Sequence, residues 1–391
     1  MIRPVHKRIF LFFAAYAFIF VSTIAPSFNC LISETGDYDI DTIADSVLIH
    51  RPHPIIGNYY VYYGSFHNHS NFSDGTGAPD YAYRYAKYRA GLDFFGLSDH
   101  GYYLDDTKWN STKTAANSYN RDSAFTAFWG LEWTSDCFGH LTIVNTEDYC
   151  SYVSPETNTF RMLCAWLNAR NCFAIFNHPR GSFYEMEFDH FTSPVCEKIV
   201  GMELWNKNDP FAVYYYNEGY DSNDNHKGYF DEALARGWKI GAAGAHDDHT
   251  ATWGTANDFR LAILAQRLTR ADLLTAMQAR RFFSTLDKNI ALSFTIAGEE
   301  MGSTVSSGNR PFTIKASDED WEHFSEVVLF DKSHAIRRLW NPNVCLVTCT
   351  DALNIASGDY YYVKIRQEDG DEAISSPIWV SDSAPIDTLS N

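Results

Sequence analysis

Short apolar segments that each end in a histidine or a carboxylate recur along this chain, and this repetition limits the folds open to it. In the densest, residues 64–75, His67 and His69 are close enough for the end of a strand to turn both toward one ion. Similar apolar runs end at or near Asp99 and His100, Glu132, His178, and residues 246–249, and another run begins directly after His140. Barrels of parallel strands collect functional groups at their carboxyl ends, so the repetition predicts an α/β barrel with a metal cluster at one end.

Helical segments alternate with the predicted strands, as such a barrel requires. The predicted helices cover residues 79–90, 160–169, 228–235 and 269–277. Gly91 marks the end of the first helix, while Thr269 and Asp272 supply the N-cap and a first-turn acid to the last one. We expect these helices to form a layer outside the barrel.

Several motifs follow one another in one order between residues 59 and 286. They are His-x-His with an Asp seven residues after its first His, Ser-Asp-His, Gly-x-Glu, Gly-His, Asn-His-Pro and Asp-x-His. In this order they resemble the polymerase and histidinol phosphatase (PHP) superfamily of metal-dependent phosphoesterases, and so many motifs rarely arise together. The Gly-x-Glu-Leu-Trp-Asn segment at 201–206 and the strand-rich C-terminal region resemble the secreted branch that includes carbaryl-hydrolase-like proteins.

The resemblance implies a distorted TIM-like (β/α)7 barrel that holds two or three divalent ions, which would be zinc, manganese or iron. The implied ligands are His67, His69, Glu132 and Asp247 for the first ion, Glu132, His140 and His178 for the second, and Asp74, His100 and His249 for the third. The last motif departs from the family pattern. His246 replaces the usual small residue and Asp248 precedes His249, so either side chain is an outer partner of the ligands or a proton donor.

The implied chemistry is hydrolysis by a water molecule that loses its proton between two ions, without a covalent serine or cysteine intermediate. Glu132, Asp247 and His249 are the ligands implied to take part in catalysis. Arg180 follows the Asn-His-Pro motif and is placed to clamp a phosphate oxygen, or alternatively to form a salt bridge on a barrel loop. We expect Asp99 to orient a loop or another ligand.

The first 29 residues predict an export signal outside the fold. Basic residues precede the apolar run 9–24, and small residues follow it at 25–27. An uncleaved membrane anchor and lipid attachment at Cys30 are the alternatives. We therefore expect an exported protein that is periplasmic, extracellular or membrane-anchored, with a polar linker over residues 30–57.

The pattern of the chain changes after Leu286, and this divides the barrel at 58–288 from a second domain at 289–391. Residues 290–296, 311–316, 326–330, 359–366 and 378–380 are the predicted strands of the second domain. Their spacing predicts a small all-β sandwich. The region has no evident ligand cluster, so we expect it to pack against the barrel or shape the substrate site.

The net charge of the chain limits the kinds of molecule that it is expected to bind. With 49 acidic and 31 basic residues the net charge is −18, which argues against a long nucleic acid bound through its phosphates. The sequence favours an exported metal-dependent phosphoesterase that acts on a small phosphate monoester or diester. Two alternatives stay open: the same metals could hydrolyse a carbamate or carboxyl ester, or the protein could bind a ligand without catalysis.

Overall fold

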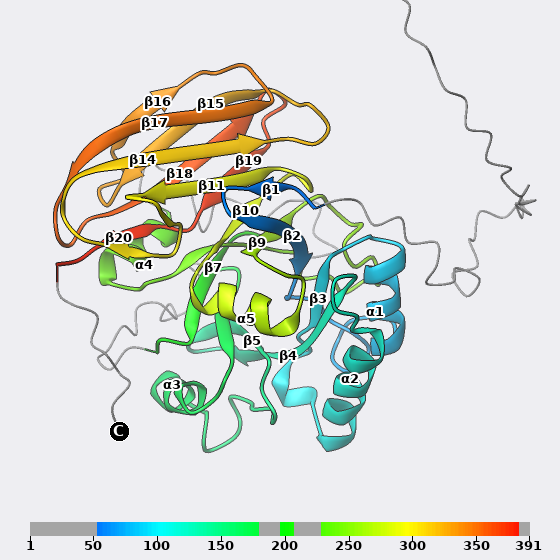
Figure 1. The fold of residues 1–391 in the computed structure, drawn as a ribbon. Coiled ribbons are helices and arrows are strands. Elements are labelled where there is room, and N and C mark those ends of the chain that lie inside the picture. The colour runs from blue at the N-terminus through cyan, green and yellow to red at the C-terminus, as the bar shows by residue number, and fades with distance from the viewer. Residues whose placement is uncertain (1–52, 180–195, 207–227, 383–391) are drawn as a thin grey trace, which may run out of the picture. The chain divides into compact units, whose positions relative to one another are not determined.

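The computed structural model describes residues 53–179, 196–206 and 228–382. The predicted export signal and Arg180 lie outside these ranges. The described residues form a mixed α/β architecture that is rich in sheet and has five α-helices (Figure 1). Within the same ranges, no helix is both long and apolar enough to span a membrane.

Four of the helices lie where the sequence predicts them. The helices are α1 (Pro79–Tyr88), α2 (Asp106–Tyr119), α3 (Phe160–Asn168), α4 (Tyr229–Arg236) and α5 (Arg270–Gln278). The Thr269 side chain accepts a hydrogen bond from the Asp272 backbone N–H and caps α5, and Gly237 ends α4 with a φ of 107°. The sequence did not predict α2, which is polar along most of its length and begins after the Asp105 N-cap.

A curled sheet forms the first part of the fold. Its strands are β2 (Tyr59–Ser65), β3 (Phe94–Leu97), β4 (Thr126–Ser135), β5 (Gly139–Val144), β6 (Phe173–Phe176), β7 (Ile199–Asn206), β8 (Gly241–Ala245), β9 (Arg260–Ala265) and β10 (Phe282–Thr285). Their order is β10-β9-β2-β3-β4-β5-β6-β7-β8, and the short β1 (Ile55–Ile56) pairs with β2. Because β8 also lies against β9 and β10, the sheet curls back on itself.

The expected seven-fold β/α repeat is not confirmed in the described residues. Strands β2, β3 and β4 are parallel, as are β6, β7 and β8, but β5 is antiparallel to both of its neighbours. Only residues 136–138 join β4 to β5, and so short a connection makes a hairpin because it has no room for a crossover helix. Strand β5 therefore begins at the edge where β4 ends.

The C-terminal region consists of two sheets, and strands occur at each predicted position. The first sheet contains β11 (Ala291–Ile296), β12 (Glu299–Glu300), β14 (Gly308–Ser317) and β17 (Leu346–Ile355). The second contains β13 (Thr304–Val305), β15 (Phe324–Asp331), β16 (Ile336–Trp340), β18 (Tyr360–Gln367), β19 (Glu372–Ser375) and β20 (Ile378–Val380). Since β19 pairs with β10, the second sheet continues the curled sheet without a break.

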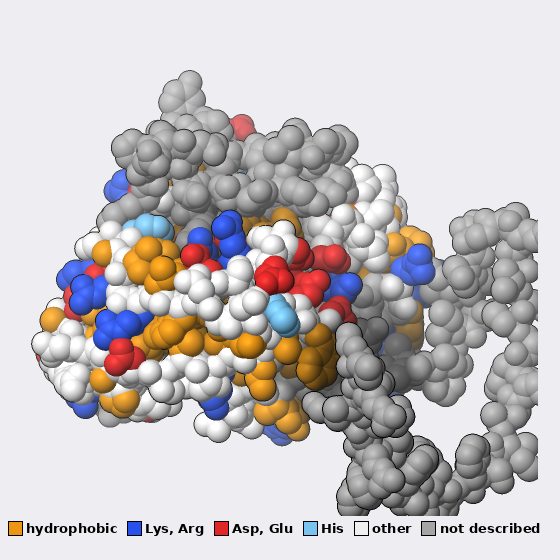
Figure 2. Space-filling view, turned by 90° about the horizontal axis from the view of Figure 1, so that it is seen from above, with side chains coloured by type: hydrophobic (Ala, Val, Ile, Leu, Met, Phe, Trp, Pro, Cys, Tyr) orange, Lys and Arg blue, Asp and Glu red, His pale blue; other side chains and the backbone are white. Residues whose placement is uncertain are grey.

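One hydrophobic core is shared by the two parts of the chain. It includes Val61 of β2 and Phe283 of β10 together with Leu292, Phe312 and Val363 of the C-terminal strands. On the face of the molecule that is seen from above, Figure 2 shows hydrophobic side chains at the surface beside a group of acidic side chains. Burial of one apolar face thus fixes the C-terminal sheets against β2, β9 and β10.

Candidate metal centre

The ends of several strands of the curled sheet bring the predicted ligands to one place. His67 and His69 follow β2, His100 follows β3, and His178 follows β6. Asp247 and His249 likewise follow β8. Two isolated parallel bridges extend the strand pairing into the site. Asn68 pairs with Asp248, and His100 pairs with Glu132.

Two ligands occupy other positions on their strands. Glu132 lies inside β4 and His140 is the second residue of β5. Because β4 and β5 form a hairpin, the start of β5 faces the same edge of the sheet as the end of β4, and Thr134 pairs directly with His140. The hairpin thus replaces a β/α unit without losing a ligand from the site.

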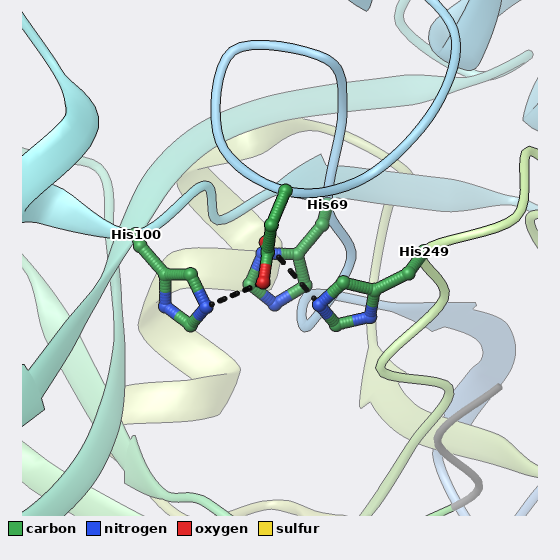
Figure 3. A group of neighbouring side chains, drawn as sticks. His69, His100 and His249 are labelled. Atoms are coloured by element: carbon green, nitrogen blue, oxygen red, sulfur yellow. Dashed lines mark ion pairs between the residues drawn. The ribbon is translucent and has the colours of Figure 1, made fainter. Parts of the chain in front are cut away.

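One group of side chains contains His69, Asp74, His100 and His249, whose ligand-type atoms lie within 4.8 Å of one another. Figure 3 shows the three imidazoles turned toward one carboxylate. Asp74 Oδ2 is 3.3 Å from His100 Nε2, and Asp74 Oδ1 is 3.3 Å from His249 Nε2 and 3.6 Å from His69 Nδ1. The rings of His69 and His249 are stacked with centroids 4.0 Å apart.

Two further groups adjoin the first. His67, Glu132 and His178 form one, and His67, His69 and Asp247 form the other. His67 Nε2 is 3.3 Å from Glu132 Oε1 and 3.2 Å from Asp247 Oδ1, while His69 Nε2 is 3.3 Å from the same Asp247 oxygen. His178 Nε2 lies 3.4 Å from Glu132 Oε1. The groups are therefore parts of one continuous cluster.

All nine side chains predicted as ligands lie in or beside these groups, although the grouping differs in detail from the predicted one. His69 joins Asp74, His100 and His249 as well as His67 and Asp247. His140 stands at the edge of the cluster, with its Nδ1 atom 3.1 Å from Glu132 Oε1. Arg180, the predicted phosphate clamp, lies outside the described residues.

The charges of the cluster shift the pKa of its groups strongly. Burial acts to lower the pKa of His67, but nearby carboxylates, with Asp247 first, outweigh it and hold that pKa well above the usual value. Burial likewise acts to raise the pKa of Glu132, and the surrounding imidazoles, with His140 first, hold it well below the usual value. The metal-free cluster thus favours ionised carboxylates that share protons with imidazoles.

The donor set fits divalent metal ions. His67 Nε2 lies 3.3 Å from His69 Nε2, 3.3 Å from Glu132 Oε1 and 3.2 Å from Asp247 Oδ1. Two imidazole nitrogens and two carboxylate oxygens are the ligands that zinc, manganese and iron accept in proteins. His178 also keeps a buried Nδ1 atom without a hydrogen-bond partner.

Glu203 is a functional residue that sequence reasoning missed. Its Oε1 atom accepts a hydrogen bond from His67 Nδ1 at 2.7 Å, and its Oε2 atom accepts from the backbone N–H of His178 and from Asn206 Nδ2, both at 2.8 Å. The carboxylate therefore turns His67 Nε2 toward the cluster and fixes the backbone of a second ligand. The sequence offers one signal for this role, which is an acidic residue inside the largely apolar segment 199–206.

Other polar side chains form hydrogen bonds with the predicted ligands or with the loop that carries them. Asn177 Nδ2 donates to Glu132 Oε1 at 2.8 Å, and Thr134 Oγ1 lies 2.7 Å from His100 Nδ1. Asp99, expected to orient a loop or a ligand, accepts from the Ser70 backbone N–H at 2.8 Å and from Ser73 Oγ at 2.6 Å. It thereby holds the loop between His69 and Asp74.

His246 and Asp248 belong to none of the three groups of predicted ligands. His246 is buried, and its Nε2 atom donates to the Phe259 backbone oxygen at 2.6 Å. Burial lowers the pKa of His246 to about 3. Asp248 accepts from the Thr250 backbone N–H at 2.7 Å and from Thr252 Oγ1 at 3.1 Å, so it shapes the turn after β8. These contacts favour a structural role for both residues over proton donation.

Two ligand positions carry an unusual backbone. The φ angles of His178 and Asp247 are 23° and 49°, in the left-handed region that L-residues with large side chains seldom adopt. Such a conformation costs about 1–3 kcal/mol and persists where the surrounding structure imposes it. At Asp247 the backbone N–H donates to the His67 carbonyl oxygen at 3.0 Å, which ties the two ligand segments together.

One side of the cluster is open to solvent. The Asp74 side chain is 44% exposed and that of His249 is 16% exposed, whereas Glu132 is only 1% exposed. The Tyr102 ring stacks on His100 with centroids 5.3 Å apart, and both Tyr102 and Tyr103 are exposed. Asp74, His249 and the two tyrosines therefore form the solvent-facing side of the cluster among the described residues.

Comparison with known proteins gives distant similarities. No family model matches the chain. It is 23% identical to an uncharacterized protein of Chlamydia pneumoniae over 365 residues, and 22% identical to one of Chlamydia trachomatis over 374 residues. These alignments cover 81% and 82% of this chain and 57% of each relative, so the chain spans little more than half their length.

A solved structure is also similar to this fold. It is a two-domain protein from Bacteroides vulgatus ATCC 8482 that contains a predicted PHP-like metal-dependent phosphoesterase. The match has a TM-score of 0.45 and 16% sequence identity, and it covers 83% of this chain and 97% of that chain.

Proposed function

We propose that this protein is an exported metal-dependent phosphoesterase that hydrolyses a small phosphate monoester or diester. The observation that carries the proposal is the sharing of side chains among the three groups, since His67 and His69 each belong to two of them. Ions held in such groups would be neighbours, as in enzymes that cleave phosphate esters with two or more ions. Binding alone does not require shared ligands around an open position.

The buried and the exposed residues of the cluster would have different roles in catalysis. Divalent ions, when bound, would supply an activated water and neutralise charge on the phosphate. The Nδ1–H of His249 donates to the Asp247 backbone oxygen at 2.9 Å, which leaves His249 Nε2 on the open side. His249 Nε2 is thus placed to hold an ion at the open side of the cluster, next to the substrate. The exposed rings of Tyr102 and Tyr103 favour a substrate with an apolar or aryl group.

The proposal extends to the family, the localisation and the partners. We infer that the curled sheet is a variant of the PHP superfamily's (β/α)7 barrel, from the secreted branch with carbaryl-hydrolase-like members. The motif order and the convergence of the predicted ligands support this inference. The basic and apolar start of the chain supports export, with attachment to a membrane as the alternative.

The test is turnover by the full chain after removal of metals and reloading with manganese or zinc. Hydrolysis of p-nitrophenyl phosphate or bis-p-nitrophenyl phosphate is the expected result, together with two or three bound ions by elemental analysis. Faster hydrolysis of naphthyl esters or carbamates would instead support the ester hydrolase alternative. Metal binding without turnover of any of these substrates would support a binding protein.

Substitution of Glu132 tests the shared cluster itself. Glu132→Gln removes the charge of a carboxylate whose oxygens lie within 3.7 Å of five imidazoles, so we expect bound metal to fall and activity to drop at least about a hundredfold. Glu156→Gln makes the same change at an exposed position that belongs to none of the groups and should match the wild type. Full activity in Glu132→Gln would contradict the proposed assignment.

A further inference from the structure

Two acid-rich loops and a third loop that carries Asp287 lie near one another in the C-terminal region, apart from the histidine cluster. They are residues 286–290 after β10, residues 318–323 after β14 and residues 368–371 after β18. Carboxylate oxygens of Asp287, Asp318 and Glu322 lie within 4.8 Å of one another. The sequence shows no evident ligand cluster here, because each loop by itself has the pattern of a solvated turn.

Buried oxygen atoms without partners also occur beside these carboxylates. Gln367 is 1% exposed and Asn289 is 7% exposed, yet Gln367 Oε1 and Asn289 Oδ1 have no hydrogen-bond partner. The same amides donate through nitrogen to Asp318 Oδ2 at 3.0 Å and to Asp320 Oδ2 at 2.7 Å, which places both side chains at the acidic loops. A buried oxygen of Glu322, Oε2, is also without a partner.

Unpaired buried acceptors of this kind are costly, because each has lost its water without gaining a donor. No Lys or Arg forms an ion pair with Asp287, Asp318 or Glu322 in the part of the chain that the structure describes. Burial, reinforced by Asp318, raises the pKa of Asp287 to about 7. The loops therefore combine unpartnered buried acceptors with several neighbouring carboxylates, near which Arg260 supplies one positive charge.

We propose that these loops form a calcium site, with Asp287, Asp318 and Glu322 as carboxylate ligands and Asn289 and Gln367 as amide ligands. All five side chains offer oxygen, and none offers the imidazole or thiolate that zinc prefers. Calcium accepts six to eight oxygens in flexible geometry, so loops from three strands suit it. The site is chemically distinct from the histidine cluster.

A cation at this position would join the C-terminal sheets to the curled sheet. Asp287 and Asn289 follow β10, and the Asn289 carbonyl oxygen accepts a hydrogen bond from Tyr63 Oη of β2 at 3.2 Å. Asp318 follows β14 and Gln367 ends β18. Calcium would thus tie a strand next to the histidine cluster to both C-terminal sheets, and its binding should stabilise the whole chain.

The experiment is a calcium titration of the full chain by calorimetry after chelation, with thermal melting in parallel. Wild type should bind one calcium ion at this site and melt at a higher temperature when calcium is present. Asp318→Asn and Glu322→Gln should each weaken binding about tenfold or more and lose the thermal shift, because each removes one negative ligand. Glu299→Gln, an exposed acid of β12, should behave as wild type.

Two further measurements separate this site from the histidine cluster and from misfolding. Glu132→Gln should keep the calcium-dependent shift, because it alters only the histidine cluster. The Glu322→Gln variant should melt no lower than wild type without calcium, since it relieves repulsion among the carboxylates. Binding of calcium that Glu132→Gln abolishes, or that Asp318→Asn and Glu322→Gln leave unchanged, would overturn the proposal, as would a wild type that binds no calcium.

Discussion

A single buried carboxylate, Glu203, forms hydrogen bonds with two members of the histidine cluster and orients them. Its two oxygens are occupied by His67 Nδ1 on one side and by the His178 backbone N–H and Asn206 Nδ2 on the other. A glutamine could satisfy only part of this pattern, because its amide nitrogen donates where a carboxylate oxygen accepts. The orientation of His67 therefore depends on the charge and symmetry of a carboxylate.

The change Glu203→Gln tests this dependence. We expect metal affinity and kcat/KM to fall about 10–100-fold, the loss typical when a partner behind a metal-binding histidine is removed. Elemental analysis and steady-state kinetics measure the two effects. Glu203→Asp, which keeps the charge on a shorter side chain, should recover part of the loss. A Glu203→Gln protein with wild-type metal content would contradict the role.

His100 gives the metal-free protein a defined pH dependence. Burial acts to lower the pKa of His100, but the carboxylates of Glu132 and Asp74 outweigh it and raise that pKa to about 10. Because the folded pKa lies above the unfolded value of about 6.5, protonation of His100 stabilises the fold fully below that value. This stabilisation disappears as the pH rises toward 10.

The measurement is the melting temperature of wild type and His100→Gln in excess chelator across this pH range. Wild type should be the more stable at the acidic end, and the difference should shrink as the pH rises. With metal bound the trend should reverse, since ligation needs the neutral imidazole. A difference between the two proteins that stays constant with pH would exclude this role of His100.

At the scale of elements, the caps of short helices hold strands in place beside the cluster. Thr269 Oγ1 accepts from the Asp272 backbone N–H at 3.1 Å and donates to Asp272 Oδ2 at 2.6 Å. Helix α5 packs on β9, which in turn pairs with β2, the strand that His67 follows. Thr269→Ala should lower the free energy of unfolding by about 1 kcal/mol, and Thr269→Ser should not. Urea denaturation checks both, and equal stability of the two variants would argue against the cap.

The sequence predicted those elements whose signals are local. Alternation in β18, the Thr269 cap and the histidines at the ends of β2 and β6 can each be recognised within a few residues. Helix α2 was missed because its buried residues are few and polar side chains surround them. The partnership of Glu203 with His67 spans 136 positions, so no local pattern could show it.

At the scale of the molecule, the division at residue 288 cuts through a shared core. The sequence changes its pattern there, yet β10 pairs with β9 on one side and with β19 on the other. Val61, Phe283 and Leu264 of the curled sheet pack with Leu292 and Val363 of the C-terminal strands. Local sequence patterns cannot predict strand pairing between segments that are so far apart in the chain. The two regions therefore depend on each other for burial of apolar surface.

A chain truncated after Lys288 should fail to reach the native state. Without β19 the edge of β10 would be unpaired, and Val61, Leu264 and Phe283 would face water. We expect aggregation on size exclusion and no cooperative thermal transition by circular dichroism. In the full chain, Phe283→Ala removes one buried ring from the same core and should cost about 3–5 kcal/mol while metal binding survives at low temperature. A truncated chain that is monomeric, melts cooperatively and binds metal would show instead that the barrel folds independently.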